Sequence, residues 1–137
     1  MKIRQVIVVE NEEFNASYIK KNVERFGYVV LEIFTNYEDT INYIKSNENI
    51  DLILININLK AKEDGIETIK DIKKIKDIPF IYMSNDMDDK TIERAFDTKP
   101  LSILYRPFKF YQIKASLSLV DHKLETGQLS NTREFKY

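Results

Sequence analysis

The sequence predicts an α/β domain in which five parallel strands form one doubly wound sheet with helices on both faces. Short runs rich in valine and isoleucine alternate five times with segments whose apolar residues recur every three to four positions. Strands joined by single helices run parallel with right-handed crossovers, and 137 residues are enough for one such domain. In such sheets, functional groups collect at the carboxyl ends of the strands.

The strands are predicted from their apolar runs, at 4–9, 28–34, 51–56, 79–83 and 101–105. The first, third and fourth runs are apolar nearly throughout. This is typical of central parallel strands that helices cover on both faces.

The helices are predicted from their periodicity, at 12–26, 37–48, 65–76, 88–97 and 109–125. Asn11 is the expected N-cap of the first helix, and Gly27 lies just past its end. Asp64 and Glu67 have the spacing of a capping box at the start of the third.

The apolar spacing also predicts which side chains of three helices face inward. The first helix is expected to direct Phe14, Tyr18, Val23 and Phe26 to one side, and the fourth Ile92, Ala95 and Phe96. The last helix carries a regular seam of Phe110, Ile113, Leu117, Val120 and Leu124. Such a seam either packs into the core or continues as a coiled coil with a partner.

Composition excludes several classes of function. The formal net charge is −1, so no strong field attracts nucleic acid or anionic membranes, and the absence of cysteine excludes disulfides and thiol chemistry. The apolar run near the amino terminus is too short for a membrane span. We expect a cytoplasmic protein with one domain at 1–126 and a polar tail at 127–137. His122 is expected at the surface, because it lies off the apolar seam.

Polar residues stand at the predicted strand ends: Glu10 and Asn11, Asn56, Ser84, and Arg106 before Pro107. The segments V-E-N-E at 9–12, D-L-I-L-I-N-I-N-L at 51–59, D-G-I-E at 64–67, P-F-I-Y-M-S at 79–84 and R-P-F-K at 106–109 occur in an order that resembles the receiver domain of response regulators. The resemblance covers about residues 4–125. It implies the flavodoxin-like (βα)5 receiver fold and a place in two-component or phosphorelay signal transduction.

The resemblance also implies roles for these positions. In receivers, an acidic pair and an aspartate that closes the third strand bind Mg²⁺, and this aspartate accepts phosphate from a histidine kinase. A hydroxyl and a lysine then hold the phosphoryl oxygens. The acidic pair falls on Glu10 and Asn11, the phosphoacceptor on Asn56, the hydroxyl on Ser84 and the lysine on Arg106. The aromatic residue that switches in many receivers corresponds to Ile103.

Three of the five pocket positions depart from the family pattern, and each departure has a chemical consequence. The amide of Asn56 carries no charge and cannot form an acyl phosphate. The family's three carboxylates and one ammonium sum to −2, whereas Glu10 and Arg106 sum to zero, so Mg²⁺ is expected to bind weakly or not at all. The planar guanidinium of Arg106 suits a carboxylate, which predicts an ion pair with Glu10.

These departures favour a non-enzymatic pseudo-receiver that acts by protein–protein interaction. Its expected surface is formed by 88–97, 101–105 and 109–125, and its expected occupant is a signalling protein, kinase or output domain, or a second copy of the chain. One alternative is a conventional phospho-accepting regulator whose two asparagines were engineered from aspartate, or which retains part of the chemistry through another carboxylate. Another is a flavin or nucleotide binder, but the acidic stretch at 10–13 would repel a phosphate. The segment 129–135 faintly resembles the start of a DNA-binding output domain.

Overall fold

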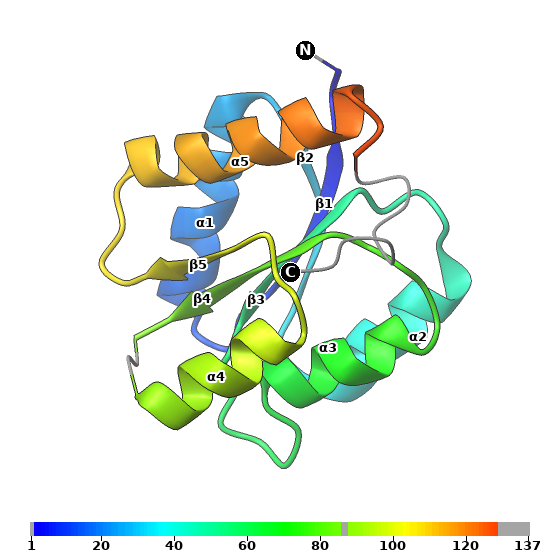
Figure 1. Ribbon diagram of the computed structural model, residues 1–137, viewed down its shortest axis with the longest axis vertical. Helices are drawn as coiled ribbons and strands as arrows, with labels where there is room; N and C mark the ends of the chain where they lie inside the picture. Colours follow the sequence, from blue (N-terminus) through cyan, green and yellow to red (C-terminus); the bar gives the residue numbers. More distant parts are fainter. Residues whose placement is uncertain (1, 86–87, 129–137) are drawn as a thin grey trace.

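The computed structural model describes residues 2–85 and 88–128, and these form one parallel sheet with helices on both faces (Figure 1). The strand order is β2-β1-β3-β4-β5, and every neighbouring pair is parallel. The strands are β1 (Gln5–Val9), β2 (Val29–Phe34), β3 (Leu52–Asn56), β4 (Phe80–Ser84) and β5 (Ser102–Tyr105). The predicted fold class is therefore confirmed. The predicted strands at 4–9, 28–34, 51–56 and 101–105 each begin one residue too early. The predicted strand at 79–83 is one residue too early at both ends, so that Ser84 closes β4.

The helices divide between the two faces of the sheet, as Figure 1 shows. One face carries α1 (Glu13–Phe26) and α5 (Phe110–Glu125), and the other carries α2 (Tyr37–Ser46), α3 (Gly65–Lys73) and α4 (Asp89–Asp97). Each face has its own apolar cluster. Ile19 and Val23 of α1 join Leu117 of α5 in one cluster, whereas Ile44 of α2 and Ile69 of α3 belong to the other.

Helix starts follow the capping residues, with one correction, whereas α2 and α3 end at Ser46 and Lys73, before the predicted ends at 48 and 76. The side chains of Asn36, Asp64 and Asp88 each accept a hydrogen bond from the backbone N–H three residues on, so they cap α2, α3 and α4. Asn11 is not the N-cap of α1, because the helix begins later and Glu12 takes that position without a side-chain cap. Gly27 ends α1 in the left-handed conformation, at φ 107°.

Burial corrects two of the predicted apolar faces. Phe14 and Tyr18 of α1 are 76% and 37% exposed, against prediction, whereas Val23 is buried as predicted. Ala16 and Ile19 complete the buried face, and with Val23 they recur at three to four residues. Phe96 of α4 is 56% exposed, and Ala95 is the residue of that helix that is fully buried. Periodicity gives the spacing of a face but not which of two overlapping faces meets the sheet.

The seam of α5 is core packing. Ile113, Leu117 and Val120 are no more than 1% exposed and lie in the cluster that contains β1 and β3 residues, so they cannot also serve a coiled coil. His122 lies at the surface, as predicted. Among residues 2–85 and 88–128, no helix is long and apolar enough to cross a membrane.

Candidate functional site

The sheet brings four of the predicted site residues together at the carboxyl ends of adjacent strands. Glu10 follows β1, Asn56 and Ser84 close β3 and β4, and Arg106 follows β5. Backbone bonds continue the pairing past the strands, from Ile57 N–H to Met83 O (2.9 Å) and from Arg106 N–H to Ser84 O (2.9 Å). The order β1-β3-β4-β5 therefore gathers side chains that lie up to 96 residues apart in sequence.

Glu10 is the centre of this site, and its carboxylate is fully committed to partners within the chain. The residue is 0% exposed. One oxygen, Oε1, receives Nη2 of Arg106 in an ion pair, as predicted from the sequence. The other, Oε2, accepts the backbone N–H of Glu12 (3.0 Å) and Nδ2 of Asn56 (3.2 Å). Charge and hydrogen bonds together compensate for the removal of this carboxylate from water.

Both ends of the Asn56 carboxamide also have partners. Nδ2 donates to Asn11 Oδ1 (3.2 Å) as well as to Glu10, and Oδ1 accepts the backbone N–H of Asn58 (3.1 Å). A carboxylate at position 56 could not donate the first two of these bonds. The amide is thus chemically matched to its acidic neighbour, and no free carboxylate remains at the end of β3.

The backbone at Asn56 is held by close packing against the start of α3. Gly65 N–H donates to Ile57 O (2.7 Å). A Cβ atom on Gly65 would lie 2.2 Å from the Asn56 carbonyl oxygen, well inside van der Waals contact. Glycine is therefore required here for close approach of two backbone segments. The sequence pattern D-G-I-E carried this signal, although only its capping role was predicted from the residues.

Arg106 lies between the buried pair and the loop that leads to α5. Its side chain is 11% exposed, its peptide bond to Pro107 is cis, and its guanidinium carbon lies 5.8 Å from the centre of the Phe108 ring. Nη1 is buried and has no hydrogen-bond acceptor among the residues that the structure describes. The guanidinium thus neutralises Glu10 but retains donor capacity.

The donors at this site do not fit Mg²⁺. Among the described residues, Glu10 supplies the only side-chain carboxylate of the hydrogen-bonded network, its charge is balanced by Arg106, and both of its oxygens already accept bonds. In the described part of the chain, no group of three or more His, Cys, Asp or Glu residues is placed to hold a metal ion. Mg²⁺ dehydrates reluctantly and relies on carboxylates, which neutral amides such as Asn11 and Asn56 do not replace.

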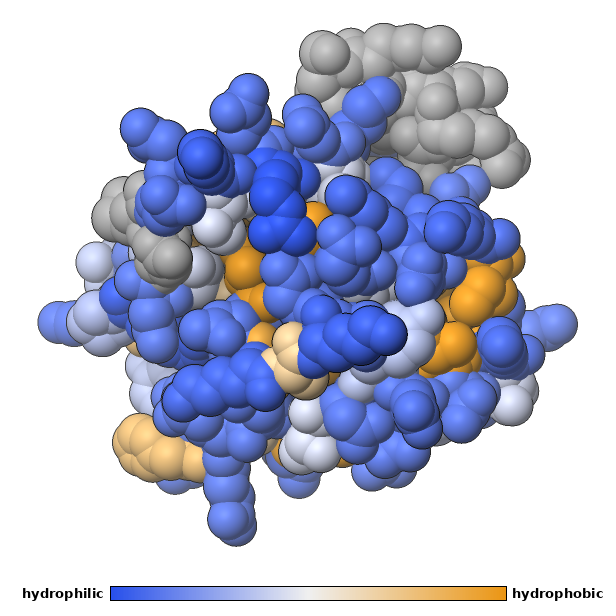
Figure 2. Space-filling model, turned by 90° about the horizontal axis from the view of Figure 1, so that it is seen from below, coloured by the Kyte–Doolittle hydropathy of each residue, from blue (hydrophilic) through white to orange (hydrophobic). Residues whose placement is uncertain are grey.

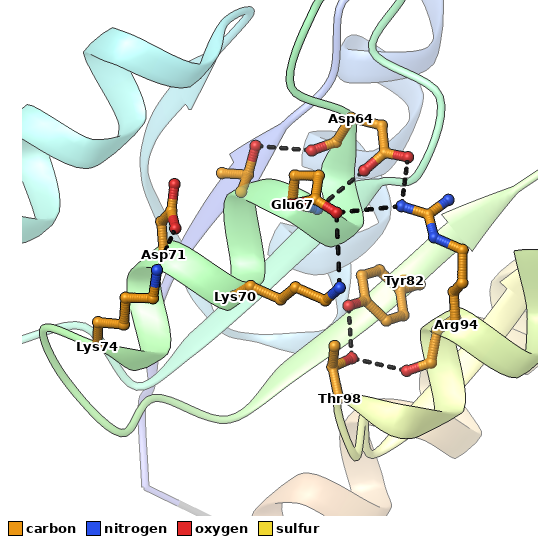
Figure 3. Close-up of polar contacts among 10 residues, drawn as sticks. Asp64, Glu67, Lys70, Asp71, Lys74, Tyr82, Arg94 and Thr98 are labelled. Carbon is orange, nitrogen blue, oxygen red and sulfur yellow. Dashed lines mark hydrogen bonds and ion pairs between the residues drawn. The ribbon is translucent and has the colours of Figure 1, made fainter.

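Ile103 pairs with Tyr82 on the neighbouring strand, a residue that the sequence analysis did not single out. Tyr82 is 0% exposed, and its hydroxyl lies 2.6 Å from Oγ1 of Thr98, which also bonds Ala95 O (2.6 Å; Figure 3). Burial raises the pKa of Tyr82 well above its ordinary value. An aromatic residue is therefore present near the position of Ile103, but it is anchored to the end of α4.

Side chains of α3 also fasten α4. Arg94 reaches from α4 to Asp64 (3.1 Å) and Glu67 (3.4 Å), as Figure 3 shows, while Lys73 Nζ donates to the Thr98 backbone oxygen (2.6 Å). Desolvation lowers the pKa of Lys73. Desolvation also lowers the pKa of Arg94, but the hydrogen bonds and charges of Asp64 and Glu67 raise it, and the net shift is upward. These bonds attach the C-terminal half of α4, from Arg94 to Thr98, to α3 and β4.

The strand order and the polar cluster beyond β1, β3, β4 and β5 define a flavodoxin-like α/β domain. Residues 6–118 match the model of the response regulator receiver domain, so the chain belongs to this family. It is a receiver domain of the two-component type, a family whose members interact with kinases and output domains.

Known relatives agree with this assignment. The chain is 28% identical over 81 residues to the transcriptional regulatory protein KdpE of Staphylococcus aureus, an alignment that covers 59% of the chain and 35% of that protein. It is 23% identical over 121 residues to the probable methanogenesis regulatory protein FilR2 of Methanothrix harundinacea, which covers 82% of the chain and 77% of that protein. The chain thus spans about a third of the first relative's length.

Solved receiver structures share the fold. The receiver domain of a modulated diguanylate cyclase from Desulfovibrio desulfuricans superposes with a TM-score of 0.82 at 25% identity, covering 92% of this chain and 99% of that one. The response regulatory domain of mrkE from Klebsiella pneumoniae gives 0.79 at 17% identity, covering 89% and 98%. At the latter identity, the likeness concerns the fold alone.

Proposed function

We propose that this receiver domain transmits signals through protein–protein contacts that do not depend on phosphorylation. The observation that carries the proposal is the buried network in which Asn56 donates to Glu10 while Arg106 neutralises it. In this arrangement Asn56 takes the phosphoacceptor position, Glu10 and Asn11 the acidic pair, Ser84 the hydroxyl and Arg106 the lysine. An amide has no anionic oxygen to attack phosphorus, so the site is a pseudo-receiver pocket.

The same network supports a single conformational state. Phosphorylated receivers change state because a new anion recruits the hydroxyl and the lysine. Here the cation already has an anionic partner, Ile103 replaces the mobile aromatic, and Tyr82 is tied to Thr98. A switch needs a ligand that binds two states differently. The bonds that hold α4 to α3 and β4 stabilise one position of α4 in the absence of any ligand.

The proposed partner surface remains the α4–β5–α5 face, but for a reason that differs from the sequence argument. The central residues of the α5 seam, Ile113, Leu117 and Val120, are buried in the core and cannot contact a partner. Instead Phe96 on α4 and Tyr111 on α5 are 56% and 67% exposed. On the side of α2, α3 and α4, the surface is mainly hydrophilic with separate apolar patches (Figure 2). Two exposed aromatics suit a regulated contact with a signalling protein, kinase or output domain, or with a second copy, better than an obligate interface.

The proposal is tested by adding Mg²⁺ with acetyl phosphate or beryllofluoride and recording backbone amide spectra. We expect no saturable shifts at Asn11, Asn56, Ser84 and Arg106 at millimolar concentrations, and no phosphorylated mass. The matched control is the triple variant Asn11→Asp, Asn56→Asp and Arg106→Lys, which restores the family pattern and is expected to respond to Mg²⁺. Saturable shifts or a covalent phosphate in the unaltered chain would instead establish a conventional phospho-accepting regulator.

A further inference from the structure

A concave apolar groove lies beside the pseudo-receiver pocket, between α1 and the loop from β5 to α5. Its volume is about 590 Å³, within the range of about 300–1,000 Å³ that is usual for small-molecule sites. The residues that determine its character are Phe14, Tyr18, Ile19, Arg106, Phe108 and Lys109, and we call it the α1–β5 groove.

Aromatic side chains form both walls of the groove. Phe14 and Tyr18 come from α1, and Phe108 comes from the loop, with the Tyr18 and Phe108 rings 6.2 Å apart and tilted by 51°. The Tyr18 hydroxyl donates to the Phe108 backbone oxygen (2.8 Å), which fixes the two walls relative to each other. Phe14, in contrast, is 76% exposed and has no ring partner among the described residues. An aromatic ligand would cover this ring.

Among the described residues that line the groove, the charged ones are Arg106 and Lys109, and both are cationic. Arg106 is paired with Glu10 but has one nitrogen without an acceptor in the described part of the chain, and Lys109 forms no ion pair there. Asn15 and Asn85 add neutral hydrogen-bonding groups. This combination suits a ligand with an aromatic body and an anionic group.

We propose that the α1–β5 groove binds a small aromatic anion, such as an aromatic carboxylate or sulfonate. Because Arg106 belongs to both the groove and the buried network, a ligand here would bias the same residues that phosphate controls in other receivers. This regulatory reading rests on the proposed function. The binding itself does not, since it requires neither Mg²⁺ nor a phosphoryl donor.

The test uses 1-anilinonaphthalene-8-sulfonate as the probe, with N-phenyl-1-naphthylamine as the neutral compound that has the same rings. Fluorescence titration of the full chain, without Mg²⁺ or phosphoryl donor, is expected to show saturable one-to-one binding of the sulfonate. The neutral compound should bind at least about fivefold more weakly. Amide shifts caused by the sulfonate should concentrate at 14–19 and 106–109.

Three surface variants make the test specific. Phe14→Ala should weaken sulfonate binding by about five- to tenfold, since it removes one aromatic wall. Lys109→Gln should weaken it by about three- to fivefold and leave the neutral compound unaffected. Phe96→Ala, an exposed aromatic on α4 outside the groove, should stay within twofold of the unaltered chain.

Several outcomes would overturn the proposal. These are the absence of saturation at millimolar probe, an equal effect of Phe96→Ala and Phe14→Ala, and equal affinity for the two probes. Loss of probe binding as the protein concentration rises would show that a second copy occupies the groove. None of these results depends on the phosphorylation experiment, so the two proposals fail separately.

Discussion

Replacing Arg106 with methionine removes the charged partner of a carboxylate that has no access to water. Glu10 is 0% exposed and the Arg106 side chain 11% exposed, so their interaction is little screened by solvent. Removing one member of a buried pair costs about 3–5 kcal/mol, because the remaining charge is left uncompensated. Arg106→Met should therefore lower the free energy of unfolding by about that amount at neutral pH.

A double-mutant cycle separates this pairing from the loss of packing. Glu10→Gln keeps the shape of the side chain and leaves a guanidinium that is 11% exposed without its anion, so its cost should be smaller than that of an unpaired, fully buried carboxylate, about 1–3 kcal/mol. The double variant should lose less than the sum of the single variants, with a coupling energy of about 2 kcal/mol. Lys74→Met is the matched surface control, since its 78% exposed ammonium pairs with Asp71 and should contribute less than about 0.5 kcal/mol.

Urea denaturation followed by far-ultraviolet circular dichroism measures these differences. At a slope of about 2 kcal/mol per molar urea, the midpoint for Arg106→Met should fall by about 1.5–2.5 M. Costs for Arg106→Met and Glu10→Gln that add within about 0.5 kcal/mol would refute the reasoning. So would a loss below about 1 kcal/mol for Arg106→Met alone, because a buried carboxylate without a partner cannot be that well tolerated.

Two further substitutions probe the elements around the site. Tyr82→Phe should lower the free energy of unfolding by about 1 kcal/mol near neutral pH, because the bond to Thr98 is lost. Because burial raises the folded-state pKa of Tyr82, the stabilising effect of its hydroxyl is complete below about pH 10 and declines above it, so the urea midpoints of the two proteins should converge as the pH rises. Midpoints that stay equally far apart would contradict the burial of this hydroxyl. Gly65→Ala should lower the free energy of unfolding by about 1–3 kcal/mol and shift the amide signals of Asn56 and Ile57, because the new methyl group meets the Asn56 carbonyl. The control Ala61→Gly, in the preceding loop, should leave those signals in place. An unshifted Asn56 signal in Gly65→Ala would show that the contact relaxes freely.

The order of strands and helices was readable from the sequence because burial on both faces imposes a simple pattern. Central strands such as β3 are apolar up to the residue that closes them, here at 52–55, and helices repeat their apolar residues every three to four positions. Parallel pairing then placed Glu10, Asn56, Ser84 and Arg106 at one edge, and the chemistry of guanidinium and carboxylate predicted their ion pair. These conclusions depend on residue type and on connectivity, which the sequence contains in full.

Only the tertiary structure decided which face of each helix meets the sheet and what each polar group bonds. The apolar positions of α1 fit two overlapping faces, and packing selected Ala16, Ile19 and Val23, which left Phe14 to line the α1–β5 groove. The bond from Tyr82 to Thr98 and the bridge from Arg94 to α3 join segments whose distance depends on crossover geometry. Side-chain contacts of this kind depend on angles and offsets between elements, which local periodicity does not encode.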